Sequence, residues 1–427
     1  MRADWNQRAR EDPHYYVAFG RRDQDEAGFL ATAADVVRGL EAELLRFPRQ
    51  ADRRALRALE IGCGPGRIMK LLSAKLGEIH GVDVSDEMIR IARERLGGIL
   101  SAHVHATTGD SLAEFAGQTF DFVYSYAVFQ HIPSRDVVLA YMRETCRVLK
   151  PGGIFRGQFN GLPDGMTPLC GFHRPDTWSG VTFSADEIRA FCRENGLRLL
   201  SLEGDRTQYM WTTWRKAAAP PNATPAGACA IRGVTNVNGS EPVAATRDSQ
   251  AGISIWVENL PEDCDLNNLR VLVDGAAGVP FHVGWPVFQA VRLVNVWLPP
   301  GLRTGLLPVE LWKDGRRVAE AATVRVIRGG PVAPRIVSIT DGFNLTQHNA
   351  SGSGILKIRV EEMRAPDSLD FAIGDLAVER LEMQCIDPRA RRYEVNLRLP
   401  AGLPAGRHTL QVRVEGWQLP AEIDTLA

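Results

Sequence analysis

A loop with three glycines at alternate positions, in the segment EIGCGPGR at residues 60–67, constrains the fold of this chain more than any other feature. Residues 56–59 before it predict a buried strand, and residues 68–72 after it predict a helix with one apolar face. Glycine lets the backbone turn sharply and approach a ligand more closely than a β-carbon would allow. The segment therefore predicts the strand–loop–helix unit of an α/β sheet that binds a nucleotide-type cofactor, and hence an enzyme.

The glycine spacing narrows the choice of cofactor. It differs from the G-x-G-x-x-G of dinucleotide folds and lacks the Gly-Lys-Ser/Thr of a phosphate-binding P-loop. The remaining ligand has a small anionic end for the exposed backbone amides and a cationic group for Glu60. S-adenosylmethionine has both, as a carboxylate and an ammonium. In these residues the sequence resembles the class I S-adenosylmethionine-dependent methyltransferases, in particular their small-molecule branch.

Further motifs carry this resemblance over residues 1–217, in the expected order. The resemblance implies that Asp83, at the end of a second strand, accepts hydrogen bonds from the ribose hydroxyls. It also implies that Asp110 accepts one from the adenine amino group and that Met88 lies near the adenine ring. The implied cofactor-binding residues are Glu60, Gly62, Cys63, Gly64, Gly66, Arg67, Asp83, Val84, Met88, Asp110, Ser111 and Tyr126.

Some of these residues also have a purely structural interpretation. Acidic residues such as Asp83 and Asp110 also occur at the ends of strands that bind no ligand. Cys63 resembles a reactive thiol, but neither a base nor a second cysteine accompanies it. Its small size within a glycine turn explains it better.

Methyl transfer needs little from a protein beyond in-line alignment in a dry pocket, because the sulfonium is a good leaving group. A hydroxyl acceptor benefits from a general base, whereas a neutral amine scarcely does. The best-placed base is His131, just beyond the strand at 119–126, and His173 is a second candidate. The alternatives are that His131 only shapes the pocket and that His173 is merely solvated.

The N-terminal segment predicts a lid. It is too polar for a signal peptide, and in relatives with this opening such a segment folds over the cofactor. We expect Tyr15 or Tyr16 to lie near the transferred methyl group, with surface packing as the alternative. Candidate contacts to the methyl acceptor, each equally suited to packing, are Tyr15, Phe129, Gln158, Asn160, His173, Trp178, Tyr209 and Trp211.

Length predicts further domains, because 427 residues exceed what a single core usually supports. A stretch rich in proline and alanine is typical of a semi-extended linker, and short alternating runs typical of strands follow it. We predict an α/β methyltransferase domain with a Rossmann-like seven-stranded sheet and helices on both faces, followed by two immunoglobulin-like β-sandwiches. The predicted bounds are 1–217 for the methyltransferase domain, 218–227 for the linker, and 228–329 and 331–427 for the sandwiches.

A weak repeat supports two similar sandwiches. The segment LPPGL at 298–302 returns as LPAGL at 399–403, a spacing close to the size of an immunoglobulin-like domain. Ile253, Ile255 and Val257 are predicted to share one face of a strand, and Val291, Leu293 and Val296 one face of another. Asp314-Gly315 predicts a hairpin turn.

Sandwiches appended to enzymes usually bind a polymer, bind a partner or dimerise. Several tryptophans suit stacking on sugar rings, although core packing explains them better. These residues are Trp285, Trp297, Trp312 and Trp417.

Charge, apolar segments and cysteine spacing argue against nucleic-acid-binding, membrane-spanning and disulfide-rich proteins. The chain has 50 basic and 51 acidic residues without a basic run, which disfavours a nucleic-acid partner. Its apolar segments are too short for a membrane span, and its seven cysteines are scattered singly. We therefore expect a cytoplasmic protein with neither a disulfide framework nor a metal site.

The favoured function is methyl transfer to a hydroxyl of a small molecule or of a glycan end. One alternative is N-methylation of an amine or peptide. Another is a non-catalytic scaffold that keeps the cofactor site while its sandwiches bind a polymer or partner.

Overall fold

The structure is a computed structural model. It describes residues 1–18, 24–48, 52–163, 177, 180–218, 227–246, 251–288, 290–329, 333–343, 347–387 and 390–426.

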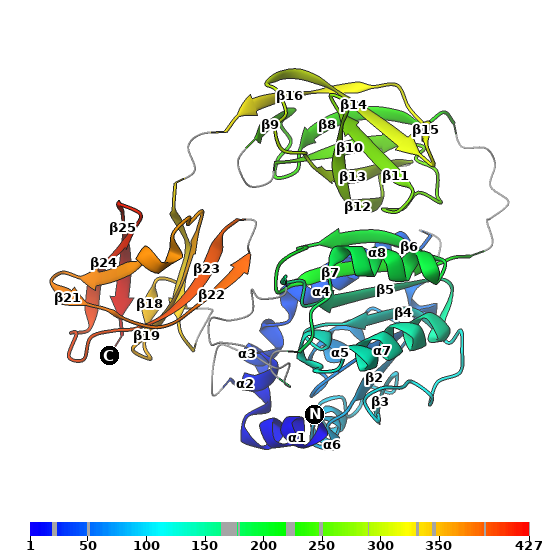
Figure 1. The fold of residues 1–427 in the computed structure, drawn as a ribbon. Coiled ribbons are helices and arrows are strands. Elements are labelled where there is room, and N and C mark those ends of the chain that lie inside the picture. Colours follow the sequence, from blue (N-terminus) through cyan, green and yellow to red (C-terminus); the bar gives the residue numbers. More distant parts are fainter. Residues whose placement is uncertain are drawn as a thin grey trace.

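A mixed seven-stranded sheet forms the centre of the N-terminal domain (Figure 1), in the order β3-β2-β1-β4-β5-β7-β6. The first five strands in this order run parallel, whereas β7 is antiparallel to β5 and β6 is antiparallel to β7. The strands are β1 (Arg57–Ile61), β2 (Glu78–Asp83), β3 (Ala102–Ala106), β4 (Phe120–Ser125), β5 (Leu149–Phe159), β6 (Leu197–Glu203) and β7 (Met210–Lys216).

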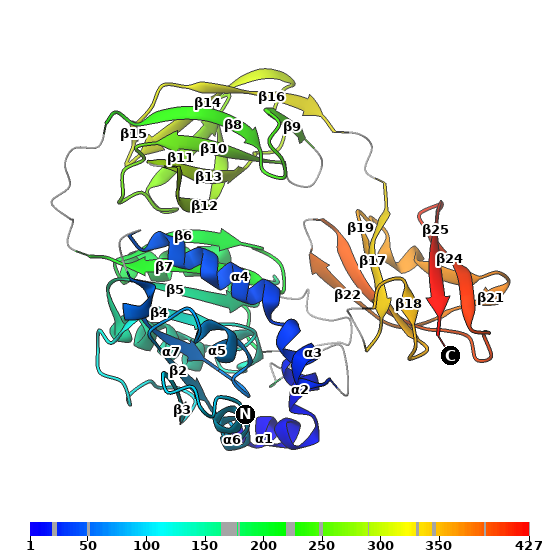
Figure 2. The ribbon, with the colours of Figure 1, turned by 180° about the vertical axis from the view of Figure 1, so that it is seen from behind.

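Helices cover both faces of this sheet, as the two opposite views show (Figures 1 and 2). Apolar residues of α4, α5 and α6 pack with Ala58 and Phe122 on one face. Residues of α7 and α8 pack with Leu59 and Phe155 on the other. The helices are α1 (Arg2–Glu11), α2 (Pro13–Val17), α3 (Glu26–Ala31), α4 (Ala34–Glu43), α5 (Arg67–Leu72), α6 (Asp86–Arg95), α7 (Arg135–Val148) and α8 (Ala185–Glu194). The short 3₁₀ turns are η1 (Leu44–Arg46), η2 (Arg53–Ala55) and η3 (Phe129–His131).

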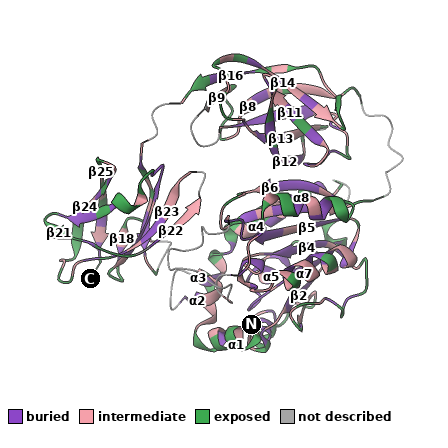
Figure 3. Ribbon diagram, viewed as in Figure 1, coloured by how far each residue is buried: buried purple, intermediate pink, exposed green. Residues whose placement is uncertain are grey.

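Local signals place the helix starts. Ser85 caps α6 by accepting a hydrogen bond from the Met88 N–H. Ser184 and Glu187 form a reciprocal capping box at α8. The burial view shows the strands of this sheet largely enclosed by their helices (Figure 3).

The first β-sandwich consists of two sheets that share the long strand β12. One sheet pairs β8, β10, β13 and β12, and the other pairs β12, β11, β14, β16 and β9. Ile253, Ile255 and Val257 point into its core, as predicted. The strands are β8 (Ala230–Asn236), β9 (Val243–Thr246), β10 (Gly252–Glu258), β11 (Leu269–Val273), β12 (Ala276–Phe288), β13 (Val291–Trp297), β14 (Gly305–Lys313), β15 (Arg316–Arg317) and β16 (Ala322–Arg328).

This sandwich packs directly on the N-terminal sheet. The edge strand β6 pairs antiparallel with β12 at Ser201 and His282. The Arg189 guanidinium of α8 donates hydrogen bonds of 2.7 Å to the Leu266 carbonyl and 2.9 Å to the Pro280 carbonyl. His282 also pairs with Glu203 at 2.8 Å. Buried apolar residues of both parts belong to one continuous core.

The second β-sandwich has a core of its own. Its sheets are β17-β19-β23-β22 and β18-β25-β24-β20-β21. The strands are β17 (Arg335–Asp341), β18 (Ala350–Ser351), β19 (Ile355–Glu361), β20 (Asp370–Ile373), β21 (Leu376–Ala377), β22 (Glu379–Asp387), β23 (Arg392–Arg398), β24 (Gly406–Val414) and β25 (Trp417–Thr425), with a 3₁₀ turn η4 at Pro366–Ser368.

The sequence repeat recurs in the backbone of the two sandwiches. Gly301 and Gly402 have φ of 78° and 81°, and Gly305 and Gly406 have φ of 126° and 140°. The pairs β10–β13 and β19–β23, which precede these glycines, are both antiparallel. The predicted fold class, an α/β domain followed by two β-sandwiches, is confirmed.

Local strand geometry agrees with the sequence patterns only in part. Strand β5 begins at Leu149 directly after α7, and Gly152 (φ 81°) lets the strand continue through a bulge. Val296 lies on the opposite face of β13 from Val291 and Leu293, and it is Val294 and Val296 that face the core. Asp314 and Gly315, by contrast, form the expected hairpin turn with φ of 47° and 76°.

Of the four tryptophans suggested for sugar stacking, Trp417 is the most open, with 47% of its surface exposed. The other three are half-buried, so none is a fully buried core residue. Among the described residues, all cysteines are free and no helix is long and apolar enough to cross a membrane.

Candidate functional site

The candidate site lies along one edge of the N-terminal sheet. Because β1, β2, β3 and β4 are parallel, their carboxyl ends meet at the same edge. Asp83 ends β2, and the loops that follow β1, β3 and β4 carry residues 62–66, 107–111 and 126–131. Ligands of open α/β sheets bind at this edge.

The glycine loop after β1 needs its glycines. Gly62, Gly64 and Gly66 have φ of 72°, 52° and 80°, which other residues rarely adopt. A Cβ on Gly62 would lie 2.3 Å from Val128, so this loop packs tightly against the loop that follows β4. Cys63 is buried, and burial raises the pKa of its thiol well above the ordinary value, in agreement with a packing role.

Glu60 is buried near the end of β1. Its carboxyl accepts a hydrogen bond of 2.9 Å from the Tyr124 hydroxyl of β4. Burial raises the pKa of Glu60 to about 8, although the Tyr124 hydrogen bond and the Arg67 charge act in the opposite direction. Glu60 is therefore largely protonated at neutral pH until a cation approaches it. Tyr124 is a site residue that the sequence did not reveal, since a tyrosine in an apolar strand is typical of core packing.

Asp83 bridges the glycine loop and α6. Its carboxylate accepts hydrogen bonds of 2.9 Å from the Gly64 N–H and 2.8 Å from the Ser85 N–H. Burial raises the pKa of Asp83, and these N–H groups counteract it. Part of the side chain stays accessible, so the carboxylate can still receive a ligand hydroxyl.

Arg67 opens α5 and connects it to the N-terminal helices. It is buried, and its guanidinium donates a hydrogen bond of 2.5 Å to the Thr32 hydroxyl. The guanidinium also lies over the Phe29 ring, at 5.3 Å, and over the Tyr126 ring, at 6.0 Å. Among the described residues, the buried Nε–H of Arg67 has no hydrogen-bond acceptor. An anionic ligand would supply one.

The remaining predicted cofactor residues lie at the same edge. Met88 is buried, and Val84 faces Gly109, where a Cβ would lie 3.1 Å from the Val84 side chain. Asp110 is exposed and accepts a hydrogen bond of 2.7 Å from the Thr108 hydroxyl. The Ser111 hydroxyl accepts one of 3.1 Å from the Ala113 N–H.

Helix α1 covers this edge from the N-terminal side. The Asn6 side chain accepts hydrogen bonds of 2.7 Å from the Ser85 hydroxyl and 3.2 Å from the Glu87 N–H, which fix α1 to the start of α6. The Arg8 guanidinium stacks on the Trp5 ring at 4.7 Å and donates a hydrogen bond of 2.9 Å to the Thr177 carbonyl. The segment therefore lies against the start of α6, and its action as a lid stays a prediction.

The two tyrosines of the predicted lid differ in their surroundings. Tyr15 is buried, with its ring 5.2 Å from that of Tyr16. Tyr16 donates a hydrogen bond of 2.8 Å to the exposed Glu11 carboxylate. It is Trp5 instead that reaches His131, the predicted base.

His131 ends η3, directly after β4. The Trp5 ring meets its imidazole edge to face, with the ring centroids 5.5 Å apart, and the Gln130 amide nitrogen lies 3.4 Å from its Nε2. Val128, in the same loop, contacts Gly62. His131 thus contacts the N-terminal helix α1, while the loop that carries it packs on the glycine loop through Val128.

Three of the predicted acceptor contacts, Trp211, Gln158 and Asn160, lie on β7, on β5 and directly after β5. Trp211 of β7 stacks on Tyr126 with the ring centroids 5.7 Å apart, beside the glycine loop. Gln158 is buried and accepts a hydrogen bond of 3.0 Å from the Ala127 N–H, so it supports the loop that carries Tyr126. Asn160 is buried and accepts one of 3.1 Å from the Leu162 N–H.

Phe129 requires a correction. It is buried in the core against Tyr141, Phe155 and Phe159, because the 3₁₀ turn directs its ring into the sheet, so its ring offers no surface to an acceptor. His173 and Trp178 lie outside the described residues.

Tyr209 lies at the border between the N-terminal domain and the second sandwich. Although 48% of its surface is exposed, the protein around it raises the pKa of Tyr209 to about 12, and the Glu394 charge on β23 adds to the effect. Glu394 itself pairs with Lys357 at 2.8 Å and with Arg359 at 2.9 Å. The Glu394 and Lys357 side chains are both almost fully buried.

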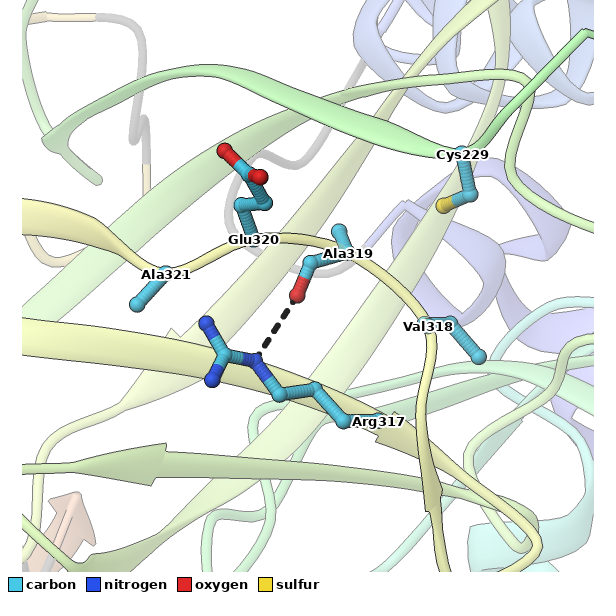
Figure 4. Close-up of a pocket in the computed structure, with 6 residues that line it drawn as sticks. All are labelled: Cys229, Arg317, Val318, Ala319, Glu320 and Ala321. Atoms are coloured by element: carbon cyan, nitrogen blue, oxygen red, sulfur yellow. Dashed lines mark hydrogen bonds between the residues drawn. The ribbon is translucent and has the colours of Figure 1, made fainter.

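The structure also has a surface depression away from the carboxyl edge of the N-terminal sheet. It is in the first sandwich, where the Arg317 Nε–H donates a hydrogen bond of 2.9 Å to the Ala319 carbonyl (Figure 4). It contains none of the residues discussed above. Its lining residues are Cys229, Arg317, Val318, Ala319, Glu320 and Ala321.

Comparison with known families decides the nature of the N-terminal domain. Residues 58–153, which run from β1 into β5, match the family described as methyltransferase domain. The N-terminal domain is a class I S-adenosylmethionine-dependent methyltransferase domain.

Relatives of the methyltransferase domain act in different reactions. A ubiquinone biosynthesis O-methyltransferase of Sinorhizobium fredii is 32% identical over 102 residues, which cover 24% of this chain and 40% of that enzyme. A trans-aconitate 2-methyltransferase of Rhodopseudomonas palustris is 32% identical over 147 residues, which cover 34% of this chain and 52% of that enzyme. The chain thus spans about half or less of the length of these relatives.

Among solved structures, the magnesium protoporphyrin IX methyltransferase of Synechocystis with bound SAH is similar to the methyltransferase domain. It is 19% identical with a TM-score of 0.37, over 51% of this chain and 98% of that one.

Proposed function

We propose that this protein transfers a methyl group from S-adenosylmethionine to a hydroxyl oxygen of a small molecule or of a glycan end. The observation that carries the proposal is the position of His131, an imidazole held against Trp5 of the lid helix at the carboxyl edge of the sheet. A relative named as an O-methyltransferase supports an oxygen acceptor.

The residues at this edge fit the cofactor. The protonated Glu60 carboxyl can lose its proton to face an ammonium, and a carboxylate would provide the acceptor that the Arg67 Nε–H lacks among the described residues. Asp83 is an acceptor for vicinal hydroxyl groups. When bound, S-adenosylmethionine supplies an electrophilic methyl group on a sulfonium that leaves as a neutral thioether.

The chain contributes alignment and one proton transfer. Tyr126, Trp211 and the lid helix exclude water from the reacting groups and hold the acceptor in line. As the acceptor oxygen forms its bond to the methyl carbon, the hydroxyl proton passes to an imidazole nitrogen of His131. Gln158 acts as a positioning residue through its hydrogen bond to Ala127.

The test is a pair of His131 variants in an acceptor screen. Phenolic, sugar and amine acceptors are offered to the full chain, with SAH formation as the readout and calorimetry for cofactor affinity. We expect His131→Ala and His131→Gln to lower kcat for hydroxyl acceptors by about 100-fold or more with little change in cofactor affinity.

The other outcomes identify the alternatives. Unchanged turnover in His131→Ala, with an amine as the best acceptor, would replace the proposal with N-methylation. Tight cofactor binding without turnover on any acceptor would favour a scaffold that keeps its cofactor as a structural ligand.

A further inference from the structure

Three histidines and a glutamate gather on one face of the β2–β3 pair. Glu78 and His80 occupy alternate positions of β2, and His103 and His105 occupy alternate positions of β3. His80 is paired in register with His103, so the side chains lie on the same face of the sheet. Neighbouring strands are only about 4.8 Å apart, which brings these side chains within reach of one another.

The donor atoms of this cluster converge. His80 Nε2 lies 2.8 Å from Glu78 Oε1, and His103 Nε2 lies 3.7 Å from the same oxygen. One ligand atom from each of Glu78, His80 and His103 lies within 4.8 Å of the other two. In a tetrahedral zinc site the ligand atoms are about 3.3 Å apart, given metal–ligand bonds of about 2.0–2.1 Å. Small side-chain rotations therefore suffice to bring the three ligand atoms to the spacing of a tetrahedral zinc site.

The surroundings of the cluster orient these ligands. His80 Nδ1 lies 3.2 Å from His105 Nε2, a hydrogen bond that fixes the His80 ring with Nε2 toward Glu78. The Arg57 guanidinium holds both Glu78 oxygens, with Nε 2.7 Å from Oε2 and Nη2 3.2 Å from Oε1, and so fixes the carboxylate beside the imidazoles. The Phe115 and Phe120 rings meet His80 edge to face and form an apolar wall on one side.

The cluster is partly open to solvent at His103 and Glu78. His80 is buried, whereas 44% of the His103 side chain is exposed. An ion can therefore reach the site past His103 and retain a water molecule. Two imidazole nitrogens and one carboxylate oxygen are a ligand set that suits Zn²⁺ and related divalent transition metals rather than Mg²⁺ or Ca²⁺.

We propose that Glu78, His80 and His103 bind a divalent transition-metal ion, with a water molecule as the fourth ligand and His105 as a positioning residue for His80. The site is separate from the cofactor edge, because Glu78 begins β2 and Asp83 ends it, a separation of about 16 Å along the strand. Its effect is to clamp the edge strand β3 to β2. The proposal does not depend on the methyl acceptor.

The test uses the full chain without a histidine tag and Zn²⁺ alone as the probe. After treatment with a chelator, calorimetry is expected to show about one ion bound at micromolar or tighter affinity, and the melting temperature to rise with zinc concentration. His103→Asn removes an exposed ligand at little risk to the fold, and we expect it to lower the affinity at least 10-fold. His105→Asn is expected to weaken binding by about 10-fold.

His408→Asn provides the matched control, because His408 is a half-buried histidine on a strand of the second sandwich, β24, and has no part in the cluster. It is expected to bind zinc as the natural sequence does. Equal binding by His103→Asn and the natural sequence would overturn the proposal and assign the ion to adventitious contacts, as would the absence of a stoichiometric site in the natural sequence.

Discussion

The Tyr124 hydroxyl donates a hydrogen bond of 2.9 Å to the Glu60 carboxyl group between two neighbouring buried strands. Burial dominates at Glu60 and raises its pKa to about 8, while Tyr124 and Arg67 lower it and Asp83 raises it further. The consequence is a carboxyl group that is neutral in the free protein near pH 7 and can ionise when a cationic ligand binds.

We therefore predict that cofactor binding releases a proton. The ammonium of S-adenosylmethionine favours the ionised carboxylate, so affinity rises with pH up to about 8 and then levels off. Calorimetry near pH 7 in buffers of different ionisation enthalpy measures the released proton. Glu60→Gln should lose most of this release. Equal proton release by this variant would show that another group ionises.

The raised pKa of Glu60 also predicts how the stability of the free protein depends on pH. Its pKa is 4.5 in the unfolded chain and about 8 in the folded protein, so the folded state binds more protons between these values. The contribution of Glu60 to the free energy of unfolding is therefore fully present below pH 4.5 and is lost as the pH rises toward 8. Urea unfolding at several pH values should show a flatter dependence for Glu60→Gln than for the natural sequence.

Asp83 should dominate the affinity for the ribose. Asp83→Asn places an amide N–H against the Gly64 or Ser85 N–H and removes the charge. A charge-assisted hydrogen bond contributes about 1.5–3 kcal/mol, so we expect affinity for S-adenosylmethionine and SAH to fall about 10- to 100-fold. Asp370→Asn is the control, because Asp370 is an exposed acid of β20 in the second sandwich and pairs there with Arg413 at 3.4 Å. An equal loss of affinity in Asp370→Asn would contradict the assignment.

The glycine loop should tolerate no side chain at Gly62. Gly62→Ala combines a left-handed backbone with a contact of 2.3 Å to Val128. The conformation costs about 1–2 kcal/mol and overpacking about 1–3 kcal/mol more. Gly98→Ala isolates the first effect, because Gly98 has φ of 88° and nothing within 4 Å of an added Cβ. Adding Val128→Ala should recover part of the stability lost in Gly62→Ala. If Val128→Ala recovers no stability, the contact between Val128 and the added Cβ does not contribute to the loss.

The contact between the methyltransferase domain and the first sandwich should depend on Arg46. Its side chain pairs with Glu43 at 2.5 Å, both almost fully buried, and donates a hydrogen bond of 2.6 Å to the Val283 carbonyl of β12. Removing one partner of a buried pair costs about 3–5 kcal/mol, which Arg46→Met should show in urea unfolding.

Arg38→Met is the control for Arg46, since Arg38 pairs with Asp35 on the exposed face of α4. An exposed pair contributes at most about 1 kcal/mol. Similar effects of the two substitutions would mean that the buried pair does not stabilise the contact between the domains.

The residues at the carboxyl edge could largely be predicted from the sequence. The glycines, Glu60 and Asp83 follow strands that the local pattern predicts, and parallel pairing brings the strand ends together. Tyr124 and Trp5 could not be found in this way. Tyr124 lies in an apolar strand, and Trp5 reaches His131 only because α1 docks on α6 through Asn6.

Phe129 shows that a residue's place in the sequence does not determine where its side chain points. Its place after β4 predicts a pocket residue, but the turn of η3 sends its ring into the core, and one residue of rotation changes the face that a side chain occupies.

The sequence by itself determined the α/β domain, the glycine loop and the two repeated sandwiches, because glycine spacing, helix caps and strand alternation act over a few neighbouring residues. Only the tertiary structure decided that β6 pairs with β12, that Glu43 and Arg46 are buried at that contact, and that Glu78, His80 and His103 converge. These relationships depend on strand register and on which surfaces meet, and both are set by the packing of residues far apart in the chain.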